Sequence, residues 1–512
     1  MQLLRSLLKQ ISYESVRGDD DRKITDICCH SEKVKEGSLF VCINGYRNNG
    51  HEYVPQAVEH GAAVLVVDDR YVIESRSGPV ILTEHMKVDV HELIRDRNIC
   101  VVTVRDTRKA LSALSAAFFD HPAERMKMIG ITGTNGKTTT AFLTAGILQE
   151  AGYRVGLYTS PHLVDFRERI RINGEMMPET YVVDFVEKHR SFFEPLHPSF
   201  FELTTAMAFR YFADEKVDVA LIEVGLGGRL DCTNIITPDL CVITNISLDH
   251  TQFLGNTLAE IAGEKAGIIK KGTPVVIGEA TEETRPVFAG KAEEMHAPIV
   301  FAEDDNRILK AENSDNGLLY ETREYGCLQG ELGGYYQIKN TNTILHALSQ
   351  LIALEYAIKE ENIRHGFARV NELTGLMGRW QKLSDHPLLI CDTGHNTGGI
   401  TYITQQIKSI VYDHLHIVIG MVNDKDIRGV LNLLPQNAMY YFTKASVKRA
   451  LPEEELKRTA REFGLHGNTY PTVTEAVRAA QEKSLPKDFI FVGGSSFIVA
   501  DLLANRNALD LD

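Results

Sequence analysis

The chain has 512 residues, of which 44% are hydrophobic and 24% are charged, and its formal net charge is −14. This length suggests about three domains, and the composition is ordinary for a soluble globular protein. The negative charge argues against nucleic acid or an acidic membrane surface as the main partner, because both would repel it. An anionic substrate would have to be bound by local lysines, arginines, helix ends or a metal ion.

The N-terminal residues predict an amphipathic helix rather than a signal peptide, because Arg5 and Lys9 interrupt their apolar stripe. We find no apolar run near the ~18 residues that a membrane span needs. The eight cysteines are scattered and lack zinc-ribbon spacing, which favours reduced thiols and a cytoplasmic location. The run Cys-Cys-His-Ser-Glu at 28–32 resembles a metal cluster, but we interpret it as a pair of packed thiols.

In the first hundred residues, short apolar runs alternate with a helical pattern. Strands are predicted at 38–45 and 62–69, with a helix between them that ends at Gly61. The segment 74–99 is charged and poorly periodic, and we expect it to be irregular.

Two longer regions repeat the strand-and-helix alternation. Their strands read as nearly continuous apolar runs, as expected for parallel sheets that are covered on both faces. The runs lie at 126–132, 153–160, 217–225, 240–247 and 273–280, and then at 388–394, 415–422, 439–445 and 488–494. A glycine-containing hinge near 374–387 separates the two regions. We therefore expect an α/β protein of three domains, with bounds 1–103, 104–373 and 374–512.

A phosphate-binding loop follows the strand at 126–132 and opens a helix. Its residues are Gly133, Thr134, Asn135, Gly136, Lys137 and Thr138. Glycines let backbone N–H groups close on phosphate oxygens, and the helix N-terminus adds its dipole. Lys137 would supply a charge to the β- and γ-phosphates, and the Thr138 hydroxyl could bind Mg²⁺. The alternative is an ordinary strand-to-helix turn.

Two polar residues stand at the ends of further predicted strands. Glu223 interrupts the apolar run 217–225, and a buried carboxylate is costly unless it is paired or bound to a metal. His250 follows the strand at 240–247. The carboxyl ends of parallel strands are where open α/β sheets bind ligands. The alternative for each residue is a structural hydrogen bond.

Lys265 lies on the apolar side of a predicted helix. Thr257 and Glu260 form a capping box at its start, and the apolar stripe consists of Leu258, Ile261, Ala262, Ala266 and Ile269. Burial should lower the pKa of a lysine on this stripe, and a neutral amine can add CO₂ to become an anionic carbamate. The alternative is a lysine that extends its ammonium to solvent.

The third region supplies a further polar group at the end of its first strand, composed of Asp392, His395 and Asn396. Arg379 lies on the preceding hinge. A hinge arginine that faces a phosphate would couple domain closure to nucleotide binding, whereas a solvated linker arginine is the alternative.

From about residue 141 onward, these motifs resemble folylpolyglutamate and dihydrofolate synthases, which are ATP-dependent amide ligases of the Mur ligase superfamily. The similar segments are 158–174, 223–234, 248–270, Met-Gly-Arg-Trp at 377–380, Asp-Thr-Gly-His-Asn at 392–396 and Asn-Asp-Lys-Asp at 423–426. Several long motifs in the same order make this resemblance specific. The commoner Asp-Gly-Ala-His-Asn-Pro is replaced here by Asp-Thr-Gly-His-Asn-Thr.

Residues 22–70 and 101–138 resemble instead the N-terminal part of UDP-N-acetylmuramoyl-tripeptide synthetase. That family usually has Asp-Ser-Arg where this chain has His30, Ser31 and Glu32, and its Asn-Pro-Arg motif is absent. The two resemblances imply a small Mur-type N-terminal α/β domain, a central P-loop ATPase-like domain with a parallel sheet, and a Rossmann-like C-terminal domain.

The resemblance also implies roles for single residues. The catalytic residues would be Lys137, Lys265, His250 and Glu223. The metal ligands would be Thr138, Glu223, His250 and Lys265 as a carbamate. ATP would contact Gly133, Thr134, Asn135, Gly136, Lys137, Thr138, Thr139, Asn340, Arg379, Asp392 and His395. The pteroate pocket would be bordered by Ser160, Pro161, His162, Arg167, Phe201 and Thr204.

The implied reaction is the ATP-dependent addition of L-glutamate to a folate or dihydropteroate carboxylate through an acyl phosphate, with Mg²⁺ as the cofactor. The expected partners are ATP, glutamate and the pteroate substrate, without nucleic acid or membrane, and we expect a monomer. One alternative is a ligase that adds an amino acid to a UDP-muramoyl peptide. Another is a hybrid that binds ATP without turnover.

Overall fold

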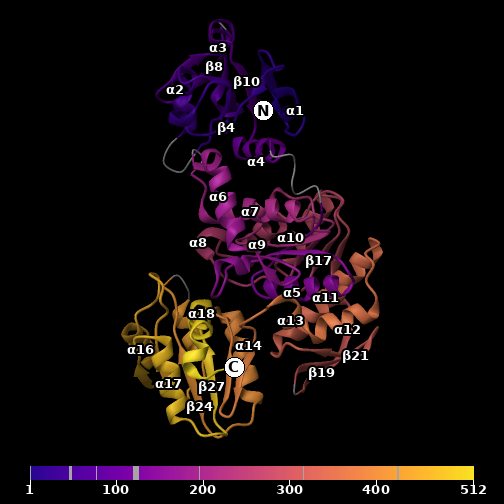
Figure 1. The fold of residues 1–512 in the computed structure, drawn as a ribbon, viewed down its shortest axis with the longest axis vertical. Coiled ribbons are helices and arrows are strands. Elements are labelled where there is room, and N and C mark those ends of the chain that lie inside the picture. The colour runs from indigo at the N-terminus through magenta and orange to yellow at the C-terminus, as the bar shows by residue number, and fades with distance from the viewer. Residues whose placement is uncertain are drawn as a thin grey trace. The chain divides into compact units, whose positions relative to one another are not determined.

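The computed structural model describes residues 2–44, 49–76, 78–118, 126–194, 197–314, 316–423 and 426–511. It divides into two compact units, one of Met1–Arg125 with Glu179–Asp214 and one of Met126–Pro178 with Glu215–Asp512. Figure 1 follows the chain through its elements. Residue 45 of the first predicted strand and residues 424 and 425 of the Asn-Asp-Lys-Asp motif lie outside the described residues. Among the described helices, none is both long and apolar enough to cross a membrane.

The first unit contains a five-stranded sheet in the order β2-β10-β6-β5-β4. Its strands are β2 (Ser15–Arg17), β4 (Ile27–Cys28), β5 (Ser38–Val41), β6 (Ala62–Asp68) and β10 (Cys100–Val104). Only β2 runs antiparallel to its neighbour. The predicted strands β5 and β6 are confirmed, as is the helix α2 (Val54–Glu59) between them. The short first helix α1 (Leu4–Leu8) buries Leu4, Leu7 and Leu8, which confirms its amphipathic pattern.

The prediction that residues 74–99 are irregular is wrong. The segment forms a small antiparallel sheet and a helix, namely β7 (Val72–Ser75), β8 (Gly78–Leu82), β9 (Lys87–Asp89) and α3 (Val90–Arg97). The carboxylate of Asp89 accepts from the backbone N–H groups of His91 and Glu92 and so caps α3. Short strands that pair only locally leave little apolar periodicity in the sequence.

Five further helices and strands lie in the described residues of the first unit. They are the short pair β1 (Gln2–Leu3) and β3 (Lys23–Ile24), the helix α4 (Thr107–Phe118), and the helices α6 (Glu179–Phe193) and α7 (Phe200–Asp214). Helices α6 and α7 come from a later part of the sequence, and Tyr181 on α6 lies edge-on to Tyr211 on α7.

The second unit begins with an eight-stranded sheet in the order β14-β13-β12-β15-β11-β16-β17-β18. The five predicted parallel strands are confirmed as β11 (Lys127–Thr132), β12 (Val155–Tyr158), β15 (Val219–Glu223), β16 (Leu240–Ile243) and β17 (Val275–Ile277). Three further strands of this sheet were not predicted, namely β13 (Ile170–Ile172) and the two edge strands β14 (Glu175–Met176) and β18 (Ile299–Phe301). Since β11 lies between β15 and β16, the segments that follow these three strands emerge side by side.

Helices and a small antiparallel sheet accompany the eight-stranded sheet. The helices are α5 (Lys137–Glu150), α8 (Thr251–Leu254), α9 (Leu258–Ala266), α10 (Arg285–Glu294), α11 (Tyr336–Ala353), α12 (Glu360–Ala368) and α13 (Val370–Thr374). The small sheet consists of β19 (Ile308–Ser314), β20 (Gly317–Thr322) and β21 (Gly326–Gly330). Two separate apolar clusters pack against the strands, one around Ile129 and Leu221 and one around Cys241 and Val275.

The C-terminal part of this unit carries a six-stranded sheet in the order β22-β23-β27-β24-β25-β26. Its strands are β22 (Gln381–Asp385), β23 (Leu388–Cys391), β24 (Leu415–Ile419), β25 (Met439–Phe442), β26 (Gly467–Thr469) and β27 (Phe489–Gly493). Its helices are α14 (Thr397–Ser409), α15 (Ile427–Leu433), α16 (Glu453–Arg461), α17 (Val473–Lys483) and α18 (Ser496–Ala504). The four predicted strands are confirmed, and the parallel pairing from β23 to β26 accounts for their apolar runs.

Candidate active site

The phosphate loop joins β11 to α5, as the sequence predicts. Gly133 and Gly136 have φ values of 147° and 81°, a region that favours glycine. A Cβ atom on Gly133 would lie 1.9 Å from Thr244 Oγ1. Lys137 Nζ turns back over the loop and donates to the carbonyl oxygens of Gly133 and Thr134 at 2.8 and 3.3 Å. An ordinary strand-to-helix turn, the alternative interpretation, does not account for a lysine ammonium that folds back onto the carbonyl oxygens of its own loop.

The segment after β16 fixes the outer edge of the loop. Thr134 N–H donates to Asn245 O at 2.9 Å, and Asn135 N–H donates to Asn245 Oδ1 at 2.9 Å. The Thr244 hydroxyl donates to Asn135 O at 2.5 Å. These bonds hold the loop before any ligand arrives, so its remaining N–H groups are preorganised for an anion.

Glu223 ends β15 and is 1% exposed. Its Oε1 accepts a hydrogen bond from the Thr138 hydroxyl at 2.9 Å, whereas Oε2 has no hydrogen-bond partner among the described residues. Burial raises the pKa of this carboxyl group, and the charge of Lys137, the Thr138 hydroxyl, the charge of Arg379 and the Ser160 backbone partly offset that effect.

The pair of Thr138 and Glu223 fits a divalent cation. A hydroxyl and a carboxylate are the hard oxygen ligands that Mg²⁺ prefers, and a buried carboxylate oxygen without a partner is costly unless a cation or a donor reaches it. Within the described ranges, no group of three or more His, Cys, Asp or Glu side chains is placed to hold a metal. A cation here would therefore need ligands of other kinds, such as hydroxyls, phosphate oxygens and water.

Lys265 lies on α9, whose start carries the predicted capping box of Thr257 and Glu260. Its side chain is 4% exposed, and Nζ donates to Gly133 O at 2.9 Å. Burial lowers the pKa of this amine well below its usual value, and the nearby charge of Lys137 lowers it further. The structure therefore excludes the solvent-extended alternative and places a lysine with a depressed pKa beneath the phosphate loop.

His250 follows β16 and lies just before α8, with a left-handed φ of 50°. Its backbone N–H donates to Asp249 Oδ1 at 2.8 Å, and its side chain is 36% exposed. A non-glycine residue in this conformation is uncommon and often marks a functional loop. His250 lies seven residues after the end of β16, in the same segment as Ser247, whose backbone N–H donates to the Thr134 hydroxyl at 3.0 Å. Its role in the site stays a prediction.

The C-terminal domain reaches the same loop. Asn396 Nδ2 donates to Asn135 Oδ1 at 3.0 Å and to Asp249 Oδ2 at 3.3 Å. His395 Nε2 lies 3.7 Å from Asp249 Oδ2, and its Nδ1 is 3.0 Å from Thr393 O. The structure thus brings the predicted group at 392–396 to the phosphate loop.

Arg379 lies in the hinge, and Asp392 is the first residue of the group at 392–396. Arg379 is half-buried, and its guanidinium donates to the Thr393 hydroxyl and, at 3.3 Å, to Gly378 O. Burial raises the pKa of both Asp392 and Glu223, and the charge of Arg379 partly offsets that rise. A solvated linker arginine would have no such partners, so that alternative does not hold.

Asn340 lies on α11 against the loop, because a Cβ atom on Gly136 would be 2.3 Å from Asn340 Oδ1. Its Nδ2 donates to Gln337 Oε1 at 2.8 Å. Gln337 is 1% exposed, and its Nε2 has no partner among the described residues. The sequence analysis missed Gln337. Its position one helical turn before Asn340 was the signal that could have found it.

The segment after β12 carries four of the predicted substrate residues, Ser160, Pro161, His162 and Arg167. His162 Nδ1 accepts from Arg169 Nε at 2.8 Å, and burial together with the charge of Arg169 lowers the pKa of His162. Arg167 pairs with Asp165 at 2.7 Å. Arg169 was also missed, because its proximity to His162 depends on the turn between them.

The last three predicted contact residues are Thr139, Phe201 and Thr204. Thr139 is buried at the first turn of α5, and its hydroxyl has no partner among the described residues. Phe201 and Thr204 lie on α7 of the first unit, where Thr204 Oγ1 donates to Phe200 O at 2.9 Å.

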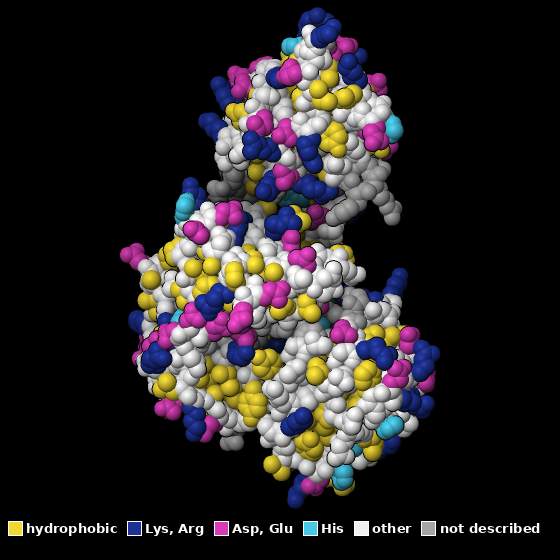
Figure 2. All heavy atoms as spheres, turned by 180° about the vertical axis from the view of Figure 1, so that it is seen from behind, with side chains coloured by type: hydrophobic (Ala, Val, Ile, Leu, Met, Phe, Trp, Pro, Cys, Tyr) yellow, Lys and Arg dark blue, Asp and Glu magenta, His cyan; other side chains and the backbone are white. Residues whose placement is uncertain are grey.

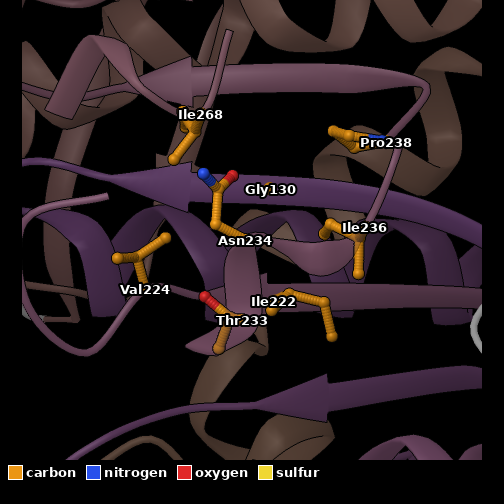
Figure 3. A pocket seen from close by; sticks show the side chains of 8 residues that line it. All are labelled: Gly130, Ile222, Val224, Thr233, Asn234, Ile236, Pro238 and Ile268. Atoms are coloured by element: carbon orange, nitrogen blue, oxygen red, sulfur yellow. The ribbon is translucent and has the colours of Figure 1, made fainter. Parts of the chain in front are cut away.

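A separate small pocket lies on one face of the eight-stranded sheet (Figure 3). Its empty volume is about 230 Å³, which includes the part that is open to solvent. It is lined by Gly130, Ile222, Val224, Thr233, Asn234, Ile236, Pro238 and Ile268. Side chains alternate along a strand, so Ile222 and Glu223 point to opposite faces of β15. The lining contains no charged residue, and the cavity does not suit a phosphate.

Comparison with known proteins places this geometry in a family. Residues 131–343 match the Mur ligase middle domain, residues 378–496 match the glutamate ligase domain of Mur ligases, and residues 23–119 match a domain described as the Mur ligase family catalytic domain. The folylpolyglutamate synthase of Lacticaseibacillus casei is 32% identical over 409 residues, which cover 77% of this chain and 93% of that protein. The chain belongs to the Mur ligase family.

Within that family, this Mur ligase is an ATP-dependent glutamate ligase of the folylpolyglutamate and dihydrofolate synthase type. An Escherichia coli structure in complex with DHPP and ADP is 32% identical, with a TM-score of 0.65 and coverage of 76% of this chain and 91% of that chain. A bifunctional folylpolyglutamate and dihydrofolate synthase with Mn, AMPPNP and L-glutamate bound is 31% identical, with a TM-score of 0.65 and coverage of 77% and 92%. The predicted family, fold class and enzyme class are confirmed.

Proposed function

We propose that this ligase joins L-glutamate to the carboxylate of a folate or dihydropteroate in two steps. The substrate carboxylate attacks the γ-phosphorus of ATP, which forms an acyl phosphate and releases ADP. The amine of glutamate then attacks the acyl carbon, the C–O bond to phosphate breaks, and an amide, inorganic phosphate and a proton are released. The observation that carries this proposal is the convergence of Lys137, Glu223 and Lys265 on one phosphate loop.

In the proposed site, Lys137 and the loop N–H groups neutralise the charge that develops on the transferred phosphoryl group. Thr138 and Glu223 would hold Mg²⁺, and the unpartnered Glu223 Oε2 supports this assignment. When bound, the cation would supply charge neutralisation between the phosphates. His250 would serve a second metal and phosphate region together with Lys265.

We propose further that Lys265 acts as a carbamate. The neutral amine adds CO₂ by forming an N–C bond and loses one proton to solvent, which leaves an anionic group on the nitrogen. The lowered pKa of Lys265 supports this chemistry, because it increases the neutral fraction of the amine, which is the form that adds CO₂. A carbamate on Lys265 would also place a negative charge close to the positive charge of Lys137, which would attract it.

The remaining residues are assigned to binding. Asn340, Arg379, Asp392 and His395 would position the nucleotide together with the loop. The pteroate would lie beside Ser160, Pro161, His162 and Arg167, and the contacts of Phe201 and Thr204 stay predictions. We also propose the domain bounds 1–103, 104–373 and 374–512, a monomeric state and a cytoplasmic location. The family matches that begin at residues 23, 131 and 378 support the division.

An acceptor panel tests the proposal. The full chain is incubated with ATP, Mg²⁺, glutamate and, in parallel, dihydropteroate, tetrahydrofolate or a UDP-muramoyl peptide, and ADP release is measured with and without glutamate. We expect glutamate-dependent ADP release with at least one pteroate acceptor. Absence of release with every pteroate would refute the proposed function.

The panel also separates the two alternatives. The match of residues 23–119 to a Mur ligase domain is the observation that keeps a UDP-linked acceptor in the test. Release with the UDP-muramoyl peptide alone would favour a cell-wall ligase. Nucleotide binding without release on any acceptor would favour a hybrid that does not turn over.

A further inference from the structure

Tyr336 connects the nucleotide-binding part of the second unit to its C-terminal domain. It is the first residue of α11, and its phenol donates to Asp392 Oδ2 at 2.6 Å. Asp392 directly follows β23 in the C-terminal domain. A hydrogen bond between a phenol and a carboxylate is of the stronger, charge-assisted kind.

The carboxylate of Asp392 is 3% exposed and depends on a few donors. Besides Tyr336, the backbone N–H of Trp380 donates to Oδ2 at 2.7 Å, and that of Gly394 donates to Oδ1 at 2.7 Å. Trp380 belongs to the hinge itself, and Gly394 belongs to the C-terminal domain that follows it. Among the donors that the described residues supply, Tyr336 alone belongs to α11.

Asp392 in turn fixes the hinge. Trp380 has a left-handed φ of 48°, and its ring packs against Phe491 of β27 with the ring centroids 6.0 Å apart. Because a non-glycine residue in this conformation persists only where its surroundings hold it, the bond from Trp380 N–H to Asp392 restrains the backbone next to Arg379.

The other end of this connection is the phosphate loop. Asn340 lies one turn after Tyr336, on the same side of α11, and its Oδ1 contacts Gly136. A second bond joins α11 to the C-terminal domain at the same point, from Tyr335 N–H to Gln406 Oε1 of α14 at 3.0 Å. The start of α11 therefore contacts both the loop and the C-terminal domain.

We propose that Tyr336 is a positioning residue for nucleotide binding. Its phenol holds Asp392, and thereby holds Arg379 and His395 at the phosphate loop. Tyr336 itself does not touch the reacting atoms and acts through Asp392. The inference rests on the proposed function only in that both concern the same nucleotide site.

Tyr336→Phe and Tyr356→Phe in the full chain form a matched pair. Tyr356 follows the end of α11, and its phenol donates to Asp239 Oδ2 at 2.7 Å, so its variant loses the same kind of bond far from the loop. The affinity for AMPPNP with Mg²⁺ is measured by calorimetry. We expect the Kd of Tyr336→Phe to rise about tenfold, as the loss of one hydrogen bond to a charged group implies. The Kd of Tyr356→Phe should stay within about twofold of the wild-type value.

A double-mutant cycle tests whether Tyr336 acts through Asp392. Asp392→Asn alone should weaken binding, and the double variant Tyr336→Phe with Asp392→Asn should bind no more weakly than Asp392→Asn. Losses that add in full would overturn the proposal, and so would a wild-type Kd for Tyr336→Phe. If Tyr336→Phe does not fold, Asp392→Asn decides, since unchanged affinity in that variant overturns the proposal as well.

Turnover gives a second reading. In the ADP-release assay, Tyr336→Phe should raise the KM for ATP about tenfold and change kcat less than threefold. A general loss of structure would lower the active fraction, and hence kcat, without raising the KM for ATP. Calorimetry with AMPPNP needs no acceptor, so failure of the acceptor panel would refute the proposed function without deciding the role of Tyr336.

Discussion

Replacing Lys265 tests whether its amine acts in the reaction or only fills space. Lys265→Ala removes three methylene groups from a site that is 4% exposed. At about 0.8 kcal/mol for each buried methylene group, this variant should lose about 2 kcal/mol of unfolding free energy. Lys265→Met keeps most of the volume and removes a buried ammonium whose hydrogen bond goes to the carbonyl oxygen of Gly133. Such a replacement is often neutral or stabilising.

Activity should respond differently from stability. If the carbamate holds a charge at the phosphate site, both variants should lose on the order of 10²- to 10³-fold in kcat, the size of the loss when one preorganised charge-stabilising group is removed. The assay is glutamate-dependent ADP release beside thermal unfolding of each variant. Turnover like that of the wild type in Lys265→Met would refute the reasoning, and so would an activity loss that merely follows the stability loss.

Two further measurements sharpen this test. A short carboxylic acid such as acetate should partly rescue Lys265→Ala, which has space for it, but not Lys265→Met, which fills the space. The second measurement is the pH dependence of the free energy of unfolding, whose sign follows from the pKa of Lys265. Because the folded-state pKa of Lys265 is lowered, the unfolded chain binds more protons between that pKa and about 10.4. The wild type should therefore gain stability relative to Lys265→Met as the pH rises through this interval.

Substitutions at three other positions probe the same site. Glu223→Gln should lower kcat by on the order of 10²-fold or more. Without nucleotide or Mg²⁺, the wild type should lose stability relative to this variant as the pH rises above about 4.3, because burial raises the folded-state pKa of Glu223. A difference in melting temperature that does not change with pH would contradict the raised pKa of Glu223. Thr138→Ser keeps the hydroxyl and should retain activity within about threefold, whereas Thr138→Ala should lose on the order of 10²-fold; equal ADP-release rates would show that the hydroxyl is not used. Gly133→Ala would place a Cβ atom 1.9 Å from Thr244 Oγ1 and should weaken AMPPNP binding at least tenfold. Gly152→Ala, which also has a positive φ but meets nothing within 4 Å, is the control, and equal nucleotide affinity in the two variants would count against a steric cause.

Much of the architecture could be predicted from the sequence because it depends on local patterns. The runs that became β11, β15 and β16 are apolar along their whole length, and both faces of these strands are covered. The capping box at Thr257 and the apolar stripe of α9 were sufficient to place Lys265 on the apolar side of a helix, but they left burial and extension to solvent as alternatives. Segments without such a pattern were missed, as residues 74–99 and the small sheet from β19 to β21 show.

The candidate site divides in the same way. The phosphate loop and the strand-end positions of Glu223 and His250 could be read from residues close together in the sequence. The partners of Asp392 could not, because Tyr336 is 56 residues away in the sequence. The hydrogen bond from Arg169 to His162 depends on a turn. The buried Nε2 of Gln337, which has no partner among the described residues, becomes apparent only once α11 packs against Gly136.

The sequence by itself therefore determined the family, the sheet-forming runs and the identity of the phosphate loop, since each depends on the order and spacing of neighbouring residues. The tertiary structure decided which charges share a site. It placed Lys265 beneath Gly133 and joined α11 to the C-terminal domain through Tyr336 and Asp392. It also left one oxygen of Glu223 without a partner in the part of the chain that the structure describes. Burial and long-range contact set the pKa and the partner of a side chain, and neither quantity is encoded in any single stretch of sequence.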